Sequence, residues 1–260
     1  MSKAKNKEFS TMMKRLMWVA LVFFGLALII SMVAKKEAAI VQQVNIDVTP
    51  LEGENYLINE EDVLLTIERS FGFPLETMPL GAVNMERLER VLKEEPFVLE
   101  ANAFVNAENV VNISIVQRQP VLRIIDRNGS NYYLDENAFK MPLSKHFSAR
   151  VLVATGNIPP YVLDYQGNIE DMLHNLFDLA TTIRNDELLH PMIEQIYVNN
   201  KRELTLVPKI GRQKILFGRY ISVEDKLKRL KIFYTEALPY EGWKKYHTID
   251  LNFEGQIVAK

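Results

Sequence analysis

The stretch Leu16–Ala34 reads LMWVALVFFGLALIISMVA and decides how the chain is organised, because none of its nineteen residues is charged. A helix rises about 1.5 Å per residue, so this one would span about 28 Å, close to the hydrocarbon thickness of a bilayer. Lys14-Arg15 and Lys35-Lys36 flank it. We therefore predict a single transmembrane helix at residues 16–34, preceded by a tail at residues 1–15.

Two other roles fit this stretch less well. A cleaved signal peptide has a shorter apolar core, about 7–15 residues, and a small residue two positions before its last small one. Here that position holds Met32. A soluble core helix is rarely apolar on every face over such a length. The tail is basic, with Glu8 as its single acid, so we expect the N-terminus in the cytoplasm and the bulk of the chain across the membrane.

Charge and cysteine content exclude several classes of function. Residues 1–36 hold seven of the 31 Lys and Arg but one of the 33 Asp and Glu, which leaves 24 basic against 32 acidic residues, a net charge of −8, in the remainder. A domain of this sign does not favour nucleic acid as a partner. Because the chain has no Cys, disulfides, thiolate catalysis and thiolate metal ligands are excluded.

Residues 44–119 have the pattern of a small α+β module. Three segments alternate apolar and polar residues, as half-buried strands do. After the first of them, Asn59 and Asn84 each precede apolar residues at helical spacing, as helix N-caps do. The order strand, helix, helix, strand, strand predicts a three-stranded sheet covered by two helices, reached through a linker at residues 35–43. The three strand segments are residues 44–48, 99–105 and 111–115.

Residues 120–260 are richer in strands and predict a mixed β module with packed helices. Asn128-Gly129 is a strong hairpin signal between two short strands. Helices are expected at residues 169–190 and 222–238, the second capped by Ser222. The strand-like segments are residues 121–126, 132–135, 151–153, 193–198, 203–207, 213–217, 246–253 and 256–259.

No motif in the chain carries recognisable chemistry. HExxH, G-x-S-x-G, a P-loop and G-x-G-x-x-G are all absent, and the His residues lack metal-ligand spacing. We therefore expect no enzyme activity, no cofactor, no metal and no small-molecule substrate. A membrane-anchored envelope hydrolase with widely separated carboxylates remains an alternative. The four His residues are His146, His174, His190 and His247.

Two segments are candidates for binding a partner. Lys226, Lys228, Arg229 and Lys231 crowd one predicted helix, and either an anionic partner or an ordinary solvated face would explain them. The C-terminal strand at residues 246–252 is a candidate for an exposed sheet edge, to which a partner strand could add through main-chain hydrogen bonds. An ordinary interior strand is the alternative. Its residues are Tyr246, His247, Thr248, Ile249, Asp250, Leu251 and Asn252.

The module order and several short motifs resemble the FtsQ/DivIB family of bacterial cell-division proteins, in a form similar to Bacteroidota members. The family's E-R-x-P block is matched by Gln117-Arg118-Gln119-Pro120, with Gln117 in place of Glu. Its Y-x-x-I-D-L-R block is matched at residues 246–252, with Asn252 in place of Arg. The other matches are Val98-x-x-Ala101-x-Ala103, Tyr133-Leu134-Asp135 followed by Lys140-Met141-Pro142-Leu143, and Gln256-Ile257-Val258.

The resemblance implies a POTRA module of β-α-α-β-β order at residues 44–119 and an FtsQ-type β domain at residues 120–260. It implies a non-enzymatic scaffold that links early and late divisome proteins and helps control septal peptidoglycan synthesis. The implied location is the inner membrane at the division septum, with the bulk of the chain in the periplasm. FtsB, joined to FtsL, would bind the strand at residues 246–252, and FtsK, FtsW and FtsI are further candidate partners. Another POTRA-bearing envelope assembly or export factor is the alternative.

Overall fold

The computed structural model describes residues 2–162 and 171–260. Its first helix, α1 (Ser2–Glu37), includes the whole uncharged stretch, and the part Leu16–Glu37 is long and apolar enough to cross a membrane. After α1 the chain follows the mixed helix and strand order expected from its sequence. The predicted α+β class with an N-terminal apolar helix is therefore confirmed.

The chain divides into two compact units, each with its own sheet. The first unit joins the residues up to Thr49 with Asn59–Val116. The second joins Pro50–Ile58 with Gln117–Lys260. The short excursion Pro50–Ile58 thus belongs to the second unit although both of its neighbours in sequence belong to the first.

Helices of the first unit begin where the sequence places their caps. Asn59 accepts a hydrogen bond from the Asp62 N–H at 2.9 Å and starts α2 (Glu60–Phe71). Asn84 accepts one from the Arg87 N–H at 2.9 Å and starts α3 (Met85–Lys93). These bonds satisfy N–H groups that a helix leaves unpaired at its first turn. Two short 3-10 turns lie between the helices, η1 (Leu75–Thr77) and η2 (Leu80–Ala82).

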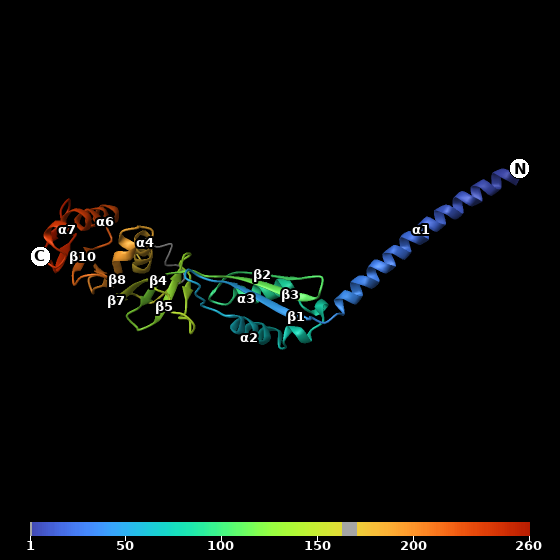
Figure 1. Ribbon diagram of the computed structural model, residues 1–260, viewed down its shortest axis with the longest axis horizontal. Helices are drawn as coiled ribbons and strands as arrows, with labels where there is room; N and C mark the ends of the chain where they lie inside the picture. Colours follow the sequence, from blue (N-terminus) through green and yellow to red (C-terminus); the bar gives the residue numbers. More distant parts are fainter. Residues whose placement is uncertain (1, 163–170) are drawn as a thin grey trace. The chain divides into compact units, whose positions relative to one another are not determined.

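The sheet of the first unit has three strands in the order β1-β3-β2, with β1 parallel to β3. They are β1 (Gln43–Thr49), β2 (Val98–Val105) and β3 (Val110–Gln117). Both helices lie beside this sheet (Figure 1). Alternate residues of β3 join the apolar faces of both helices in one core, as the alternation in sequence predicts. The buried residues include Val63, Ile67, Leu88, Leu92, Val111, Ile113 and Ile115.

The second unit is built on a nine-stranded mixed sheet in the order β12-β11-β10-β9-β8-β7-β4-β5-β6. Parallel pairs join β4 to β7, β7 to β8 and β10 to β11, whereas the other neighbours are antiparallel. Gly129, at φ 83°, lies in the predicted turn between β4 and β5. The strands are β4 (Pro120–Ile125), β5 (Asn131–Asp135), β6 (Lys140–Met141), β7 (Leu152–Gly156), β8 (Ile193–Val198), β9 (Leu204–Pro208), β10 (Lys214–Gly218), β11 (Thr248–Asp250) and β12 (Val258–Ala259).

Helices of this unit differ from the sequence prediction in two places. The helix expected at 169–190 is α4 (Met172–Arg184) followed by the separate short α5 (Leu189–Met192), and the expected residues 169–170 lie outside the described part. Asp186 interrupts it, because its carboxylate accepts the N–H groups of Leu188 and Leu189 at 3.0 Å. Such local bonds compete with a continuous helix.

The predicted cap at Ser222 is wrong, although a helix does start there. A capping residue normally has extended backbone angles. Ser222 instead has a left-handed backbone, φ 53°, and its side chain makes no capping bond. The helix α6 (Val223–Ile232) continues through the π-helical segment η4 (Phe233–Ala237) into α7 (Leu238–Glu241). These helices lie beside β10 at the C-terminal end of the sheet (Figure 1). Their apolar sides join the sheet's core through Leu227, Leu230 and Tyr234.

Candidate partner-binding site

The predicted partner strand is centred on β11, which lies one position inside the sheet. Ile249 pairs with Ile215 of the parallel strand β10 on one side and with Ala259 of the antiparallel strand β12 on the other. The outermost strand at this end is β12, which the sequence marks as strand-like at residues 256–259. The prediction that residues 246–252 form an edge strand is therefore wrong, because the chain folds back in a hairpin and β12 covers β11.

The seven predicted site residues fall into a buried and an exposed group. Ile249 and Leu251 are fully buried in the core of the sheet. Tyr246 packs its ring 5.9 Å from that of Phe233, between centroids. The other four residues are partly or fully exposed: His247, Thr248, Asp250 and Asn252. Only the backbone of the buried residues belongs to the pairing, so their side chains stabilise the strand rather than face a partner.

The free edge at this end of the sheet is the outer side of β12. Thr248 and Lys260 exchange two backbone hydrogen bonds, at 3.0 and 2.9 Å. In an antiparallel pair such hydrogen-bonded positions alternate with positions whose N–H and C=O point away. Ala259, opposite Ile249, is the next position, so its N–H and C=O point away from β11 and toward the open edge.

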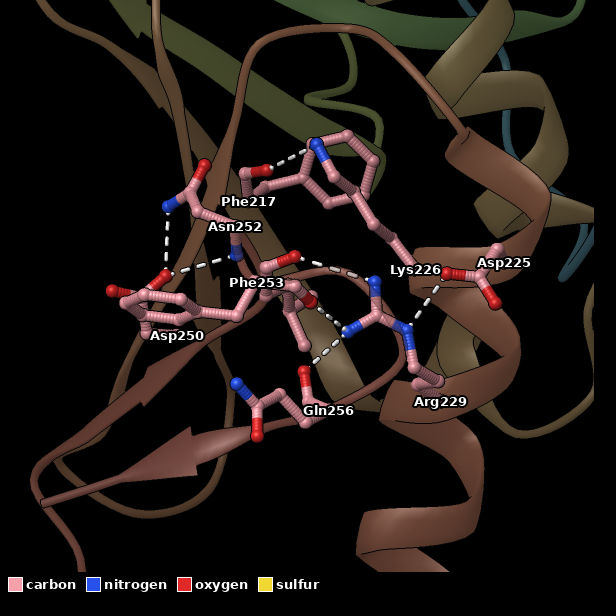
Figure 2. Close-up of polar contacts among 9 residues, drawn as sticks. Phe217, Asp225, Lys226, Arg229, Asp250, Asn252, Phe253 and Gln256 are labelled. Carbon is pink, nitrogen blue, oxygen red and sulfur yellow. Dashed lines mark hydrogen bonds and ion pairs between the residues drawn. The ribbon is translucent and has the colours of Figure 1, made fainter.

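Arg229 of α6 fastens the hairpin between β11 and β12 (Figure 2). Its Nη1 donates to the Phe253 carbonyl at 2.9 Å and to the Gln256 carbonyl at 2.5 Å. Its Nη2 lies 3.4 Å from the Leu251 carbonyl. Asp225, one helical turn earlier, holds the guanidinium through Nε at 2.8 Å. One side chain therefore joins the helix to three points along the hairpin.

A second basic residue of α6 ties the end of β10 to the same region. Lys226 is buried, and its Nζ donates to the Phe217 and Arg219 carbonyls, both at 2.8 Å. Burial lowers the pKa of Lys226, and the charge of Arg229 lowers it further. Between the two accepting residues, Gly218 has φ 76°, and a Cβ there would lie 1.7 Å from Asn252 Oδ1. The chain after β10 and the chain after β11 are thus in close contact.

Two family models match the chain and together cover most of it. One is described as FtsQ/DivIB, C-terminal related, and matches residues 119–260, more than half of the chain. The other is described as a POTRA-like domain and matches residues 39–116. The chain belongs to the FtsQ/DivIB family. No curated protein gives a significant match to it.

Each of the two folded units corresponds to one of the matched family models. The POTRA-like match falls on the three-stranded unit, and the FtsQ/DivIB match falls on the nine-stranded sheet that carries the C-terminal hairpin. FtsQ/DivIB domains imply a role in cell division. In the two described stretches, residues 2–162 and 171–260, no group of three His, Asp or Glu residues is placed to hold a metal ion.

Most of the basic residues on helix α6 of this FtsQ/DivIB-family domain make contacts within the fold. Lys226 and Arg229 contact backbone carbonyls, and Lys231 pairs with Asp186 at 2.6 Å. Three of the four cations therefore hold the fold together, and Lys228 is left exposed. Spacing alone does not reveal this, because it shows that the residues share a helix but not what lies opposite them.

A groove lies next to the hairpin in the same FtsQ/DivIB-family domain. Its volume is about 870 Å³. Exposed Ile221 is on its wall, and Phe253 of the hairpin is exposed nearby. Exposed apolar side chains in and beside a groove are more typical of a protein-binding surface than of a small-molecule pocket. The groove is lined by Glu203, Arg219, Ile221, Ser222, Asp225, Lys226, Arg229, Leu251, Asn252, Glu254 and Gly255.

Proposed function

We propose that this protein is a non-enzymatic scaffold of the bacterial divisome that links early and late division proteins and helps control septal peptidoglycan synthesis. The helix Leu16–Glu37 anchors it in the inner membrane in a single pass. The excess of Lys over acid in the tail keeps the N-terminus in the cytoplasm, so both folded units lie in the periplasm at the septum. Domain boundaries follow at residues 15, 34, 43 and 119.

FtsB, joined to FtsL, is the proposed partner of the C-terminal strands. The supporting observation is the open edge of β12, with unpaired main-chain groups at Ala259. A strand of FtsB adds there through main-chain hydrogen bonds, and the strand at 246–252 supports it from inside the sheet. The POTRA-like unit and the anchor are the proposed contacts for FtsK, FtsW and FtsI.

A proline at Ala259 tests this model. Proline removes the outward N–H and leaves intact the bonds between β12 and β11, since edge strands tolerate proline when its nitrogen faces solvent. We expect Ala259→Pro to weaken binding of the detergent-solubilised full chain to the FtsB–FtsL pair at least tenfold, measured by isothermal titration calorimetry. Loss of one main-chain bond together with steric exclusion of the partner strand makes such a change of about 1.4 kcal/mol reasonable.

The matched control is Ala259→Val, which keeps the N–H and favours a strand. It should bind as the unchanged chain does. Equal affinity for the Pro and Val variants would rule out strand addition at β12. Unaltered circular dichroism of both variants confirms that the fold is retained in the comparison.

A further inference from the structure

We propose that Arg229 is a positioning residue for partner binding: it holds the β11–β12 hairpin in place so that the outer edge of β12 is presented as an ordered strand. This proposal rests on the function proposed above. Arg229 does not itself meet the partner, because its side chain is 13% exposed and its nitrogens point inward, toward α6 and the hairpin (Figure 2).

The contacts of Arg229 cover the part of the hairpin that lacks ladder pairing. Between Asp250 and Val258, the last residues in strand register, its guanidinium reaches the carbonyls of residues 251, 253 and 256. Hydrogen bonds from a charged donor are stronger than neutral ones. The planar guanidinium of arginine can donate to several acceptors at once in a fixed geometry. The ammonium of lysine is a compact point charge without that geometry.

The strand that Arg229 supports has little to hold it otherwise. β12 has two residues, and its pairing with β11 extends only to the neighbouring Lys260. A strand this short does not stay ordered by its own hydrogen bonds. If the hairpin were loose, a partner strand would have to order it on binding. The partner's apparent affinity would then be the intrinsic affinity multiplied by the fraction of molecules whose hairpin is formed.

The first test substitutes Arg229→Gln in the full chain. We expect faster hydrogen–deuterium exchange across residues 251–260. We also expect affinity for the FtsB–FtsL pair to fall about tenfold if the ordered hairpin drops to about a tenth of the population. Lys228→Gln is the matched control, because it removes the same charge from an exposed neighbour on the same helix. Unchanged exchange in Arg229→Gln overturns the proposal, whatever the partner does.

The second test asks whether Arg229 acts through the hairpin. Thr248 and Lys260 face each other across the pair, so Thr248→Cys with Lys260→Cys can form a disulfide. The chain has no other Cys. This staple should restore binding to Arg229→Gln when oxidised and lose that effect when reduced.

Each outcome of the staple experiment is informative. Failure of the oxidised staple to rescue Arg229→Gln shows that Arg229 acts in another way. Loss of binding when the staple is placed in the otherwise unchanged chain shows that the partner displaces β12, which also overturns the proposal. If the unchanged chain does not bind FtsB–FtsL, the proposed function fails, and hydrogen exchange alone then judges the role of Arg229.

Discussion

Gly218 lies at the end of β10, close to the Asn252 side chain that follows β11. Its backbone is left-handed, at φ 76°, and an added Cβ would lie 1.7 Å from Asn252 Oδ1. We expect Gly218→Ala to reduce the free energy of unfolding by about 1–3 kcal/mol, mostly from the left-handed backbone and the rest from moving the Asn252 side chain aside. Urea unfolding followed by Trp243 fluorescence measures this, since Trp243 packs near Tyr234 in the same unit.

A double mutant separates the two contributions to this loss. Asn252→Ala removes the oxygen that the new methyl group meets, so Gly218→Ala with Asn252→Ala should recover the part due to the clash but keep the backbone part. Strictly additive effects of the two substitutions would show that residues 218 and 252 do not meet as the structure has them.

Two residues of the Gln117–Pro120 motif, Gln117 and Arg118, have structural roles that their sequence does not reveal. Gln117 Oε1 accepts the Leu57 N–H at 2.6 Å and the Ile58 N–H at 3.3 Å, so an amide serves where a carboxylate is usual in the family. Arg118 forms a nearly buried ion pair with Asp135 at 2.8 Å. Two motifs are thus joined by a contact between residues seventeen positions apart in sequence. Neither partner could be predicted from sequence, because both contacts join residues that are distant along the chain.

Among the elements, α6 is joined to the break between α4 and α5 by the Lys231–Asp186 ion pair. Burial alone would raise the pKa of Asp186, but the hydrogen bond from Lys231 and those from Leu189 and Leu188 N–H outweigh it, so the net pKa is lowered from 3.8. Because the folded-state pKa lies below the unfolded one, this carboxylate stabilises the fold above pH about 4 and loses its contribution as the pH falls through the folded-state value.

The substitution Asp186→Asn tests that contribution. It should lower stability at pH 7 by about 1 kcal/mol, a modest amount because both side chains are partly exposed. At a pH below the folded-state pKa, the variant and the unchanged chain should be equally stable. Thermal unfolding at the two pH values measures the difference, and a stability gap that persists unchanged at low pH would show that the carboxylate charge is not involved.

Local pattern predicted most elements along the chain but not the order in which the strands lie in the larger sheet. Alternation identified the strands, and Asn59 and Asn84 capped helices as expected, because these signals depend on neighbours in sequence. The place of β12 outside β11 was not predictable, since it depends on a parallel pairing of β10 with β11 across the intervening helices. The continuous helix at 169–190 failed because one carboxylate, on Asp186, captured nearby N–H groups.

For the whole molecule, sequence was most informative about topology and least informative about partners. The uncharged stretch alone predicted the N-terminal apolar helix, because bilayer thickness sets a length that few other segments reach. Identifying the POTRA-like and FtsQ/DivIB units from sequence required several motifs that resemble the family and occur in the same order. The outer strand β12 lies within ten residues of the predicted strand at 246–252. The contacts of Arg229 with the hairpin could not be predicted, because they depend on how α6 packs against it (Figure 2).

A role at the division septum requires the protein to gather there, which imaging of the full chain in dividing cells can show. A fluorescent protein fused to the N-terminal tail leaves the anchor and both folded units intact. We expect a band at mid-cell that appears before constriction. It should require the folded units, so a fusion ending after Glu37 should spread around the membrane. An even distribution of the full-length fusion along the envelope of dividing cells would contradict it.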